Sequence, residues 1–245
     1  MHYDTILLMV PTYKRHISLL RFIQSALRQA DDPSRVRFCL CVNEKDQSTR
    51  DFVRMLYFPH VKQCEVILED TDQPNLPLYF NKMYRETIFT DAVVSMVGDD
   101  MEFATQGWDV AILSAINASE GKSIVYCDDD YIAHDKLCVN MFTTREVVEA
   151  TRKPFMCERY HADMIDVVWM SVGLKTGLLR YLPEVKIKHL HQSARRTEDQ
   201  DETYRRMIPV RQAANSQDLK KYAEAYATVC AANLIDAGIG QWNTI

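Results

Sequence analysis

The sequence predicts an α/β fold in which helices flank a mostly parallel central sheet. Two observations indicate this class: short apolar runs alternate with longer segments of helical spacing through the first half of the chain, and a polar cluster follows each apolar run. A length of 245 residues and an apolar content of 47% allow the chain to bury a substantial core. The sequence contains no internal repeat and no linker that would divide it.

The first elements follow from the spacing of apolar residues. A run at 6–10 is the first expected strand, and Pro11 is expected to end it. Apolar residues then recur at helical spacing from Leu19 to Leu27, until Asp31-Asp32-Pro33 breaks the helix. The same alternation predicts strands at 36–42, 66–68, 92–97 and 123–127 and helices at 52–57 and 79–89.

The rest of the chain is expected to be more helical. A helix is predicted at 163–176, where Gly177 stops it, and alternation from Val185 to His191 predicts a last strand. The alanine-rich segment 217–237 also has helical spacing. The expected division is a main domain at 1–206 and a C-terminal helical extension packed on it at 207–245.

Composition and charge exclude several classes of protein. The net charge of −5 gives no overall attraction to nucleic acids or anionic membranes. The seven cysteines include no CxxC pair, which favours buried free thiols in a reducing compartment. We find neither a signal peptide nor an apolar run of the ~20 residues that span a membrane. These observations predict a cytoplasmic protein without a membrane span.

Polar clusters rich in carboxylates follow the expected strands. In open α/β sheets, ligands bind outside the carboxyl ends of the strands, so these clusters should share one edge. Carboxylates in such a place can hold Mg²⁺ or Mn²⁺ together with a substrate diphosphate, or can simply cap turns and helices. The clusters are Pro11–Arg15, Asn43–Asp46, Glu69–Asp72, Asp99-Asp100 and Asp128–Asp130.

Five stretches, in this order, resemble a known enzyme family. They read ILLMVPTYKR, VRFCLCVNEKD, VVSMVGDDMEF, QGWDVAIL and PEVKIKHLH. They are similar to nucleotide-sugar glycosyltransferases of the GT-A fold, close to the family-2 type, over roughly residues 5 to 195. The resemblance implies a Rossmann-like sheet and a hexosyltransferase that uses a nucleoside-diphosphate sugar, with uridine as the expected nucleoside.

The resemblance also implies a metal site. Asp99-Asp100 falls at the family's Asp-x-Asp signature, although Gly98 stands in place of the first aspartate. This departure leaves Asp100 as the expected ligand of Mn²⁺ or Mg²⁺. Asp99 is expected to contact the ribose or to serve as a second ligand.

A histidine is expected to complete the metal site. His189 and His191 come two residues apart and therefore project to the same side of an extended segment. Such a pair can bind a metal by itself, whereas a lone buried histidine is more common than a ligand. Because metal-dependent members of the family use a histidine late in the domain, the resemblance selects His191 over His189. His134 is expected to be a loop residue.

The donor-binding residues are likewise implied by the resemblance. Two strand ends would form the nucleobase pocket: Pro11, Thr12, Tyr13 and Arg15 from the first, with Asn43 or Asp46 from the second. Lys82, on the helix before the metal strand, would either face the diphosphate or lie on a solvated helix face.

The helix at 163–176 offers a general base for inverting transfer. Asp163 and Asp166 are three residues apart and so share one helical face. In the family, the base is an aspartate about three turns before a glycine. Counting back from Gly177 selects Asp166, with Asp163 as the second candidate, while either could merely cap the helix.

The acceptor is the least determined part of the prediction. Trp108 would stack on the acceptor or fill the core, and Asp128 and Asp129 are assigned to the acceptor side. Between Lys186 and Arg211, seven Lys and Arg stand against four acids, an excess of three positive charges. This basic strip makes a hydroxymethylated pyrimidine in DNA a candidate acceptor, beside glycan, lipid and protein acceptors.

Two other functions remain open at this point. A nucleotidyltransferase that makes sugar nucleotides would also use an α/β sheet and acidic metal ligands, but PTYKRH after the first strand lacks the usual glycine-rich phosphate loop. A non-catalytic module that binds a nucleotide sugar is the other alternative.

Overall fold

The computed structural model describes residues 2–56, 64–69, 75–87, 92–131, 133–159, 164–190, 202–203, 205–206, 208 and 217–243. Within these residues, eight strands form one sheet in the order β3-β2-β1-β4-β7-β6-β8-β5. The strands are β1 Ile6–Thr12, β2 Val36–Asn43, β3 Cys64–Glu69, β4 Val93–Met96, β5 Met101–Phe103, β6 Ile124–Asp128, β7 Met141–Thr143 and β8 Leu179–His189. The helices are α1 His16–Gln29, α2 Gln47–Met55, α3 Leu76–Glu86, α4 Trp108–Ala118, α5 Arg145–Ala150, α6 Ile165–Thr176 and α8 Gln217–Asp236.

The sheet has a parallel half and a mixed half. β1, β2, β3 and β4 run parallel, as do β6 and β8. β7 joins the two halves through antiparallel pairs with β4 and β6, and β5 pairs antiparallel with β8. Four of the seven neighbouring pairs are therefore parallel, which confirms the predicted mostly parallel sheet.

Pro11 lies inside β1 and does not end the strand, contrary to expectation. β1 continues to Thr12, and Pro11 is in register with Cys41 of β2. Proline lacks an amide hydrogen, so it is tolerated only where that side of the strand needs no ladder bond. β4 pairs with β1 only at Ile6 and Leu7, which leaves the β4 side of Pro11 outside the ladder.

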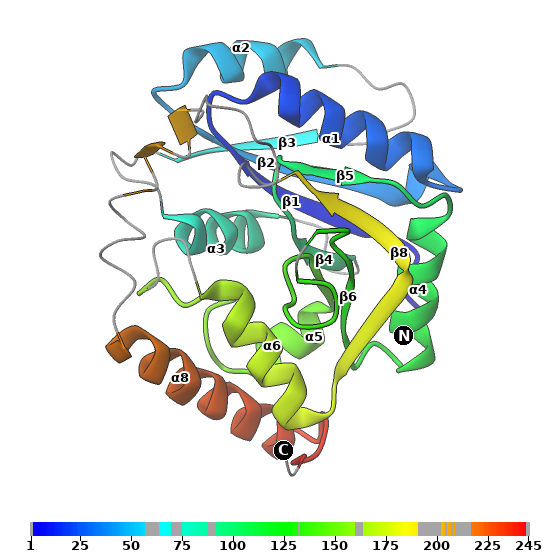
Figure 1. Ribbon diagram of the computed structural model, residues 1–245, viewed down its shortest axis with the longest axis vertical. Helices are drawn as coiled ribbons and strands as arrows, with labels where there is room; N and C mark the ends of the chain where they lie inside the picture. Colours follow the sequence, from blue (N-terminus) through cyan, green and yellow to red (C-terminus); the bar gives the residue numbers. More distant parts are fainter. Residues whose placement is uncertain are drawn as a thin grey trace.

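Two apolar layers cover opposite faces of the sheet. Along β1, Leu7 and Met9 belong to one core cluster, whereas Ile6, Leu8 and Val10 belong to the other. This split follows from the alternation of side chains along a strand. Figure 1 shows α1 and α2 on one side of the strands and α3, α6 and α8 on the other.

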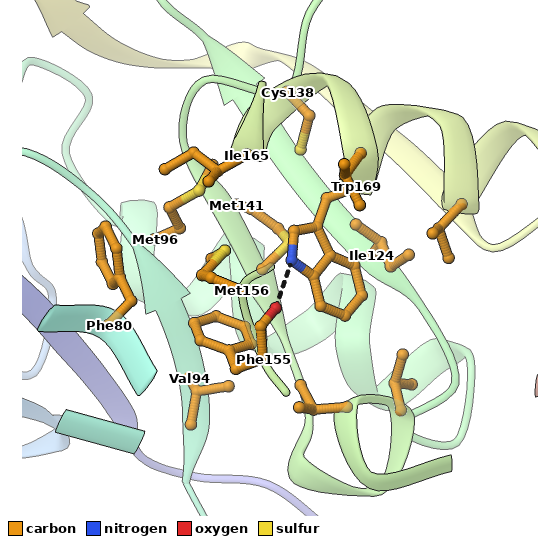
Figure 2. Close-up of a cluster of buried hydrophobic side chains, with 14 of the residues drawn as sticks. Phe80, Val94, Met96, Ile124, Cys138, Met141, Phe155, Met156, Ile165 and Trp169 are labelled. Atoms are coloured by element: carbon orange, nitrogen blue, oxygen red, sulfur yellow. Dashed lines mark hydrogen bonds between the residues drawn. The ribbon is translucent and has the colours of Figure 1, made fainter. Parts of the chain in front are cut away.

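The apolar layer that contains Leu7 and Met9 also holds α6 on the sheet. Figure 2 shows Trp169 of α6 among apolar side chains that include Ile124, Met141 and Phe155. The indole Nε1 of Trp169 donates a hydrogen bond to the Phe155 carbonyl oxygen at 3.1 Å. Because Trp169 is almost fully buried, the first turn of α6, which carries Asp166, has a fixed position relative to the sheet.

The C-terminal helix α8 packs on α6. Glu224 of α8 pairs with Lys175 at 2.6 Å and accepts a hydrogen bond from Ser171 at 3.0 Å. Ala223, Ala227 and other small residues of α8 are buried in the same layer as Trp169. The domain boundary at 206 stays a prediction. Among the helices of the described ranges, none combines the length and apolar character needed to cross a bilayer.

Candidate functional site

Asp99 lies in the turn after β4 and is the centre of the candidate site. The residue is only 4% exposed. Its Oδ2 accepts a hydrogen bond from Thr12 Oγ1 at 2.8 Å, and its Oδ1 accepts one from Arg15 Nη1 at 2.9 Å. Thr12 ends β1 and Arg15 caps α1, and because β1 and β4 are parallel neighbours, their carboxyl ends meet at one edge.

Arg15 bridges the two aspartates. Its Nη1 also lies 3.5 Å from Asp100 Oδ2, and its side chain is only 8% exposed. The guanidinium charge offsets part of the cost of burying the two carboxylates. Thr12 and Arg15 were expected to line the nucleobase pocket; the structure shows that their side chains donate hydrogen bonds to Asp99.

His189 adjoins the other side of Asp100. Its Nε2 lies 3.7 Å from Asp100 Oδ1. Two backbone bonds hold the end of β8 in place: His189 N donates to the Asp129 carbonyl at 2.9 Å, and Leu190 N donates to the Asp100 carbonyl at 2.8 Å. The predicted ligand His191 lies outside the described residues, so the structure brings His189 to Asp100 and leaves His191 a prediction.

The pKa values of Asp99 and His189 reflect this crowding. Burial raises the pKa of Asp99 to about 6; Arg15 opposes this shift and Asp100 adds to it. Burial lowers the pKa of His189, but the carboxylates of Asp100, Asp129 and Asp166 outweigh burial, and the net shift is upward. Asp166, the expected base, is therefore close enough to His189 for its charge to act at the site.

Asp166 lies in the first turn of α6 and is partly buried. Its Oδ1 accepts a hydrogen bond from Val167 N at 2.8 Å. The residue that caps the helix is Met164, with a positive φ of 80° and no side-chain cap bond. Asp166 is thus a partly buried carboxylate next to the helix N-terminus. Asp163 lies outside the described residues.

The site residues fit a hard divalent cation at Asp100. A carboxylate oxygen and an imidazole nitrogen are ordinary ligands of Mn²⁺, and Asp100 and His189 are each about one-fifth exposed. Asp99 fits less well because both of its oxygens already accept hydrogen bonds, from Thr12 and Arg15. Of the two expected aspartates, Asp100 is the better ligand.

A second acidic group follows β6 and is held differently. We call Asp128, Asp129, Asp130 and His134 the Asp128 loop. Ligand atoms of Asp128, Asp129 and His134 lie within 4.8 Å of one another. Asp129 accepts hydrogen bonds from the amides of Ala133 and His134 at 3.1 and 2.8 Å, and Asp128 contacts His134 Nδ1 at 2.9 Å. These carboxylates accept hydrogen bonds from their own loop, as expected for aspartates in turns.

The predicted nucleobase pocket is bordered by the C-terminal part of the chain. Tyr13 has the Arg206 guanidinium 4.1 Å from its ring centroid. The Tyr13 carbonyl accepts a hydrogen bond from Thr203 at 2.6 Å, and Lys14 pairs with Glu202 at 2.7 Å. These contacts join residues about 190 positions apart, so no local sequence pattern predicts them.

Asn43 and Asp46 shape the turn beside that pocket. Asp46 is 1% exposed and accepts hydrogen bonds from Lys14 N at 2.6 Å and Thr49 N at 3.1 Å. It is thus the N-cap of α2, and it also ties that helix to the β1–α1 turn. Asn43 Oδ1 accepts a hydrogen bond from Lys45 N at 2.9 Å.

The structure places Trp108 in the core, whereas the role of Lys82 stays a prediction. Trp108 is 0% exposed, donates its Nε1 hydrogen to the Ala26 carbonyl at 2.9 Å and packs on Phe103, so it is a core residue and cannot line an acceptor. Lys82 Nζ lies 3.7 Å from Glu86 Oε1, one turn along α3, and the Lys82 side chain is 26% exposed, which leaves both of its alternatives open. We propose no acceptor role for Trp108.

No protein-family model matches the sequence, and no curated protein matches it. Solved structures do. S. aureus TarS residues 1–349 superposes with a TM-score of 0.61 at 10% identity, over 95% of this chain and 72% of TarS 1–349. A Pyrobaculum calidifontis mannosyltransferase, solved with GDP-Man and Mn²⁺, gives 0.56 at 15% identity, over 97% and 77%.

A third structure belongs to the same group. The catalytic domain of Drosophila β1,4-galactosyltransferase 7 gives a TM-score of 0.51 at 12% identity, over 90% of this chain and 84% of that domain. In all three, the match covers at least 90% of this chain. The chain therefore has the GT-A fold of nucleotide-sugar glycosyltransferases, as the sequence predicted.

Proposed function

We propose that this protein is a metal-dependent, inverting glycosyltransferase that moves a sugar from a nucleoside-diphosphate sugar to an acceptor hydroxyl. The observation that carries the proposal is the convergence of Arg15, Asp99, Asp100 and His189 from three separate strand ends, with Asp166 within electrostatic range. In a GT-A fold, this edge of the sheet is where a ligand is expected.

Each residue has a distinct proposed role. Mn²⁺ or Mg²⁺, held by Asp100 with His189 or His191, would act as a Lewis acid that stabilises charge on the leaving diphosphate. Arg15 and Thr12 bind both oxygens of Asp99, so Asp100 is the carboxylate that would contact the metal. Asp166 would take the proton from the acceptor hydroxyl on the face opposite the leaving group.

The proposed donor is a uridine-linked sugar. A TarS 1–349 structure contains UDP-GlcNAc, and the mannosyltransferase contains GDP-Man, so the fold accepts both nucleosides. Tyr13, with Asn43 or Asp46, is the proposed nucleobase contact. A direct comparison of uridine and guanosine donors decides which nucleoside the protein binds.

The proposed acceptor is a hydroxymethylated pyrimidine in DNA, and its support is the basic strip between Lys186 and Arg211. Lys186 of this strip pairs with Asp130 at 2.9 Å, and Lys188 is the register partner of Glu102 in the β5–β8 pair. The phosphate contacts would therefore come from the arginines of the strip.

The test begins with donor hydrolysis across UDP- and GDP-sugars, with Mn²⁺ or with EDTA. Metal-dependent hydrolysis of one donor supports the proposal. If a donor binds but is neither hydrolysed nor used for transfer to any acceptor, the protein is a non-catalytic module instead. Acceptor trials then compare hydroxymethylated DNA, unmodified DNA of the same sequence, and free glycans. Transfer only to glycans would overturn the DNA acceptor but not the glycosyltransferase.

A further inference from the structure

Gly98 occupies the position at which the Asp-x-Asp signature has its first aspartate, and the space beside it is filled. A Cβ atom built on Gly98 would lie 2.6 Å from Asp100 Oδ1, well below the 3.0 Å that real Cβ contacts essentially never cross. The Asp100 carboxylate therefore folds back over the face of Gly98 that a side chain would use.

The backbone does not explain this glycine. The glycines of the described residues that have a positive φ are Gly107, Gly121, Gly177, Gly238 and Gly240. Gly98 is not among them, so an alanine could adopt its backbone conformation without strain. Position 98 requires glycine because Asp100 Oδ1 occupies the space in which a Cβ atom would lie.

A Cβ at position 98 would displace Asp100 and not its neighbours. The Asp100 backbone is held because its carbonyl accepts a hydrogen bond from Leu190 N. Arg15 is held by Asp99 and His189 by the Asp129 carbonyl. The Asp100 side chain is the movable part, and its rotation would take its oxygens away from Arg15, at 3.5 Å, and His189, at 3.7 Å.

We propose that Gly98 is a positioning residue for the metal-binding carboxylate: its missing Cβ is what lets Asp100 reach Arg15 and His189 at once. The inference rests on the proposed function only in taking Asp100 as the metal ligand. It has an unexpected consequence, since restoring the family's aspartate with Gly98→Asp adds a carboxylate but disrupts the site.

The first experiment measures Mn²⁺ binding by electron paramagnetic resonance, with UDP present, for wild type, Gly98→Ala and Gly98→Asp. We expect each variant to bind Mn²⁺ at least about tenfold more weakly, the range seen when a group that orients a ligand is lost. Gly238→Ala is a control for glycine substitution away from the site: a Cβ there meets nothing within 4 Å, although the φ of +74° at this position strains an alanine. It should bind Mn²⁺ as wild type does.

The second experiment needs no metal. Thermal unfolding in EDTA is compared for Gly98→Ala in the wild-type and Asp100→Ala backgrounds. Gly98→Ala should lower the unfolding midpoint when Asp100 is present and raise it when Asp100 is absent, because the clash is then gone and alanine restricts the unfolded chain. The same sign in both backgrounds overturns the inference.

The two failures are distinguishable. If wild type binds Mn²⁺ and Gly98→Ala or Gly98→Asp binds it equally well or better, the positioning role is wrong and the proposed function stands. If wild type binds no Mn²⁺, the metal part of the proposed function fails, and the positioning role toward a metal fails with it.

Discussion

The turn after β4 and the loop after β6 both carry consecutive aspartates at the carboxyl end of a strand, yet they bind their partners in opposite ways. Asp99 and Asp100 interact with side chains from other elements, Thr12, Arg15 and His189. Those partners lie about 90 positions away in the sequence.

The carboxylates of the Asp128 loop form their hydrogen bonds mainly with groups of the same loop. Asp129 accepts amide hydrogens from residues four and five positions ahead, and Asp128 contacts His134, six positions ahead. The difference teaches that a count of acids does not identify a site. Convergence of side chains from distant elements identifies it, because local turn formation cannot explain such convergence.

The largest expected effect separates the two regions directly. Asp100→Ala should abolish Mn²⁺-dependent binding of UDP while the protein stays folded, because the residue lies at a partly exposed strand exit where truncation opens no large cavity. Asp128→Ala is the matched control from the other region and should leave the affinity unchanged. Calorimetric titration of UDP with Mn²⁺ measures both, and unchanged affinity in Asp100→Ala contradicts the metal assignment.

The next effect tests whether Asp166 belongs to the convergent site. Asp166→Asn should keep donor and metal affinity near wild type, because the amide preserves volume, yet lower transfer by a factor on the order of 10² to 10⁴. Asp163→Asn should lose much less. If Asp163→Asn is the inactive variant, the assignment along this helix is wrong by one turn; if neither loses transfer, Asp128 and Asp129 become the next candidates.

The sequence predicted the parts of the fold with strong periodicity. Long apolar runs identified β1, β2 and β4, and helical spacing identified α1, α6 and α8. β5 and β7 have three residues each, too few for a period to be recognised. β8 begins at Leu179, earlier than expected, because Pro183 and Glu184 interrupt the alternation that the sequence shows only from Val185 onward.

The sequence suggested candidate site residues but not their contacts. The motif selected Asp100 and the count from Gly177 selected Asp166, and the roles of both stay predictions. The Thr12, Arg15 and Asp99 network depends on two parallel strands meeting at one edge, which no local pattern encodes. Trp108 shows the converse: its sequence position suggested a ligand contact, while its burial is a property of the packed core.

Acid should also distinguish the two regions, with opposite signs. Burial raises the pKa of Asp99 from 3.8 to about 6, so between these values the folded state binds more protons than the unfolded state. The free energy of unfolding therefore falls as pH rises through this window, by about 1.4 kcal/mol for each unit of pKa shift. Asp99→Asn should remove this fall.

Asp128 is the control for that experiment. Burial alone raises the pKa of Asp128, but the Asp130 amide and His134 outweigh it and the pKa is lowered below 3.8. Its stabilisation is thus present above pH 3.8 and lost as the pH falls through the lowered value. Urea unfolding from pH 3 to 7 in EDTA measures both slopes. An unchanged slope between pH 4 and 6 in Asp99→Asn contradicts the assignment.

The smallest expected effect decides which histidine belongs to the convergent site. The resemblance favours His191, whereas the structure brings His189 Nε2 to 3.7 Å from Asp100 Oδ1. A neutral ligand neutralises less of the charge than a carboxylate, so loss of the correct histidine should weaken Mn²⁺ binding by about tenfold, less than loss of Asp100.

His189→Ala and His191→Ala are therefore compared by Mn²⁺ titration, with His134→Ala from the Asp128 loop as the matched control. A loss confined to His191→Ala supports the family assignment. A loss confined to His189→Ala moves the ligand two residues inward, to a position whose backbone amide donates to the Asp129 carbonyl. Weakening by His134→Ala alone would transfer the metal to the Asp128 loop and reverse the comparison between the two regions.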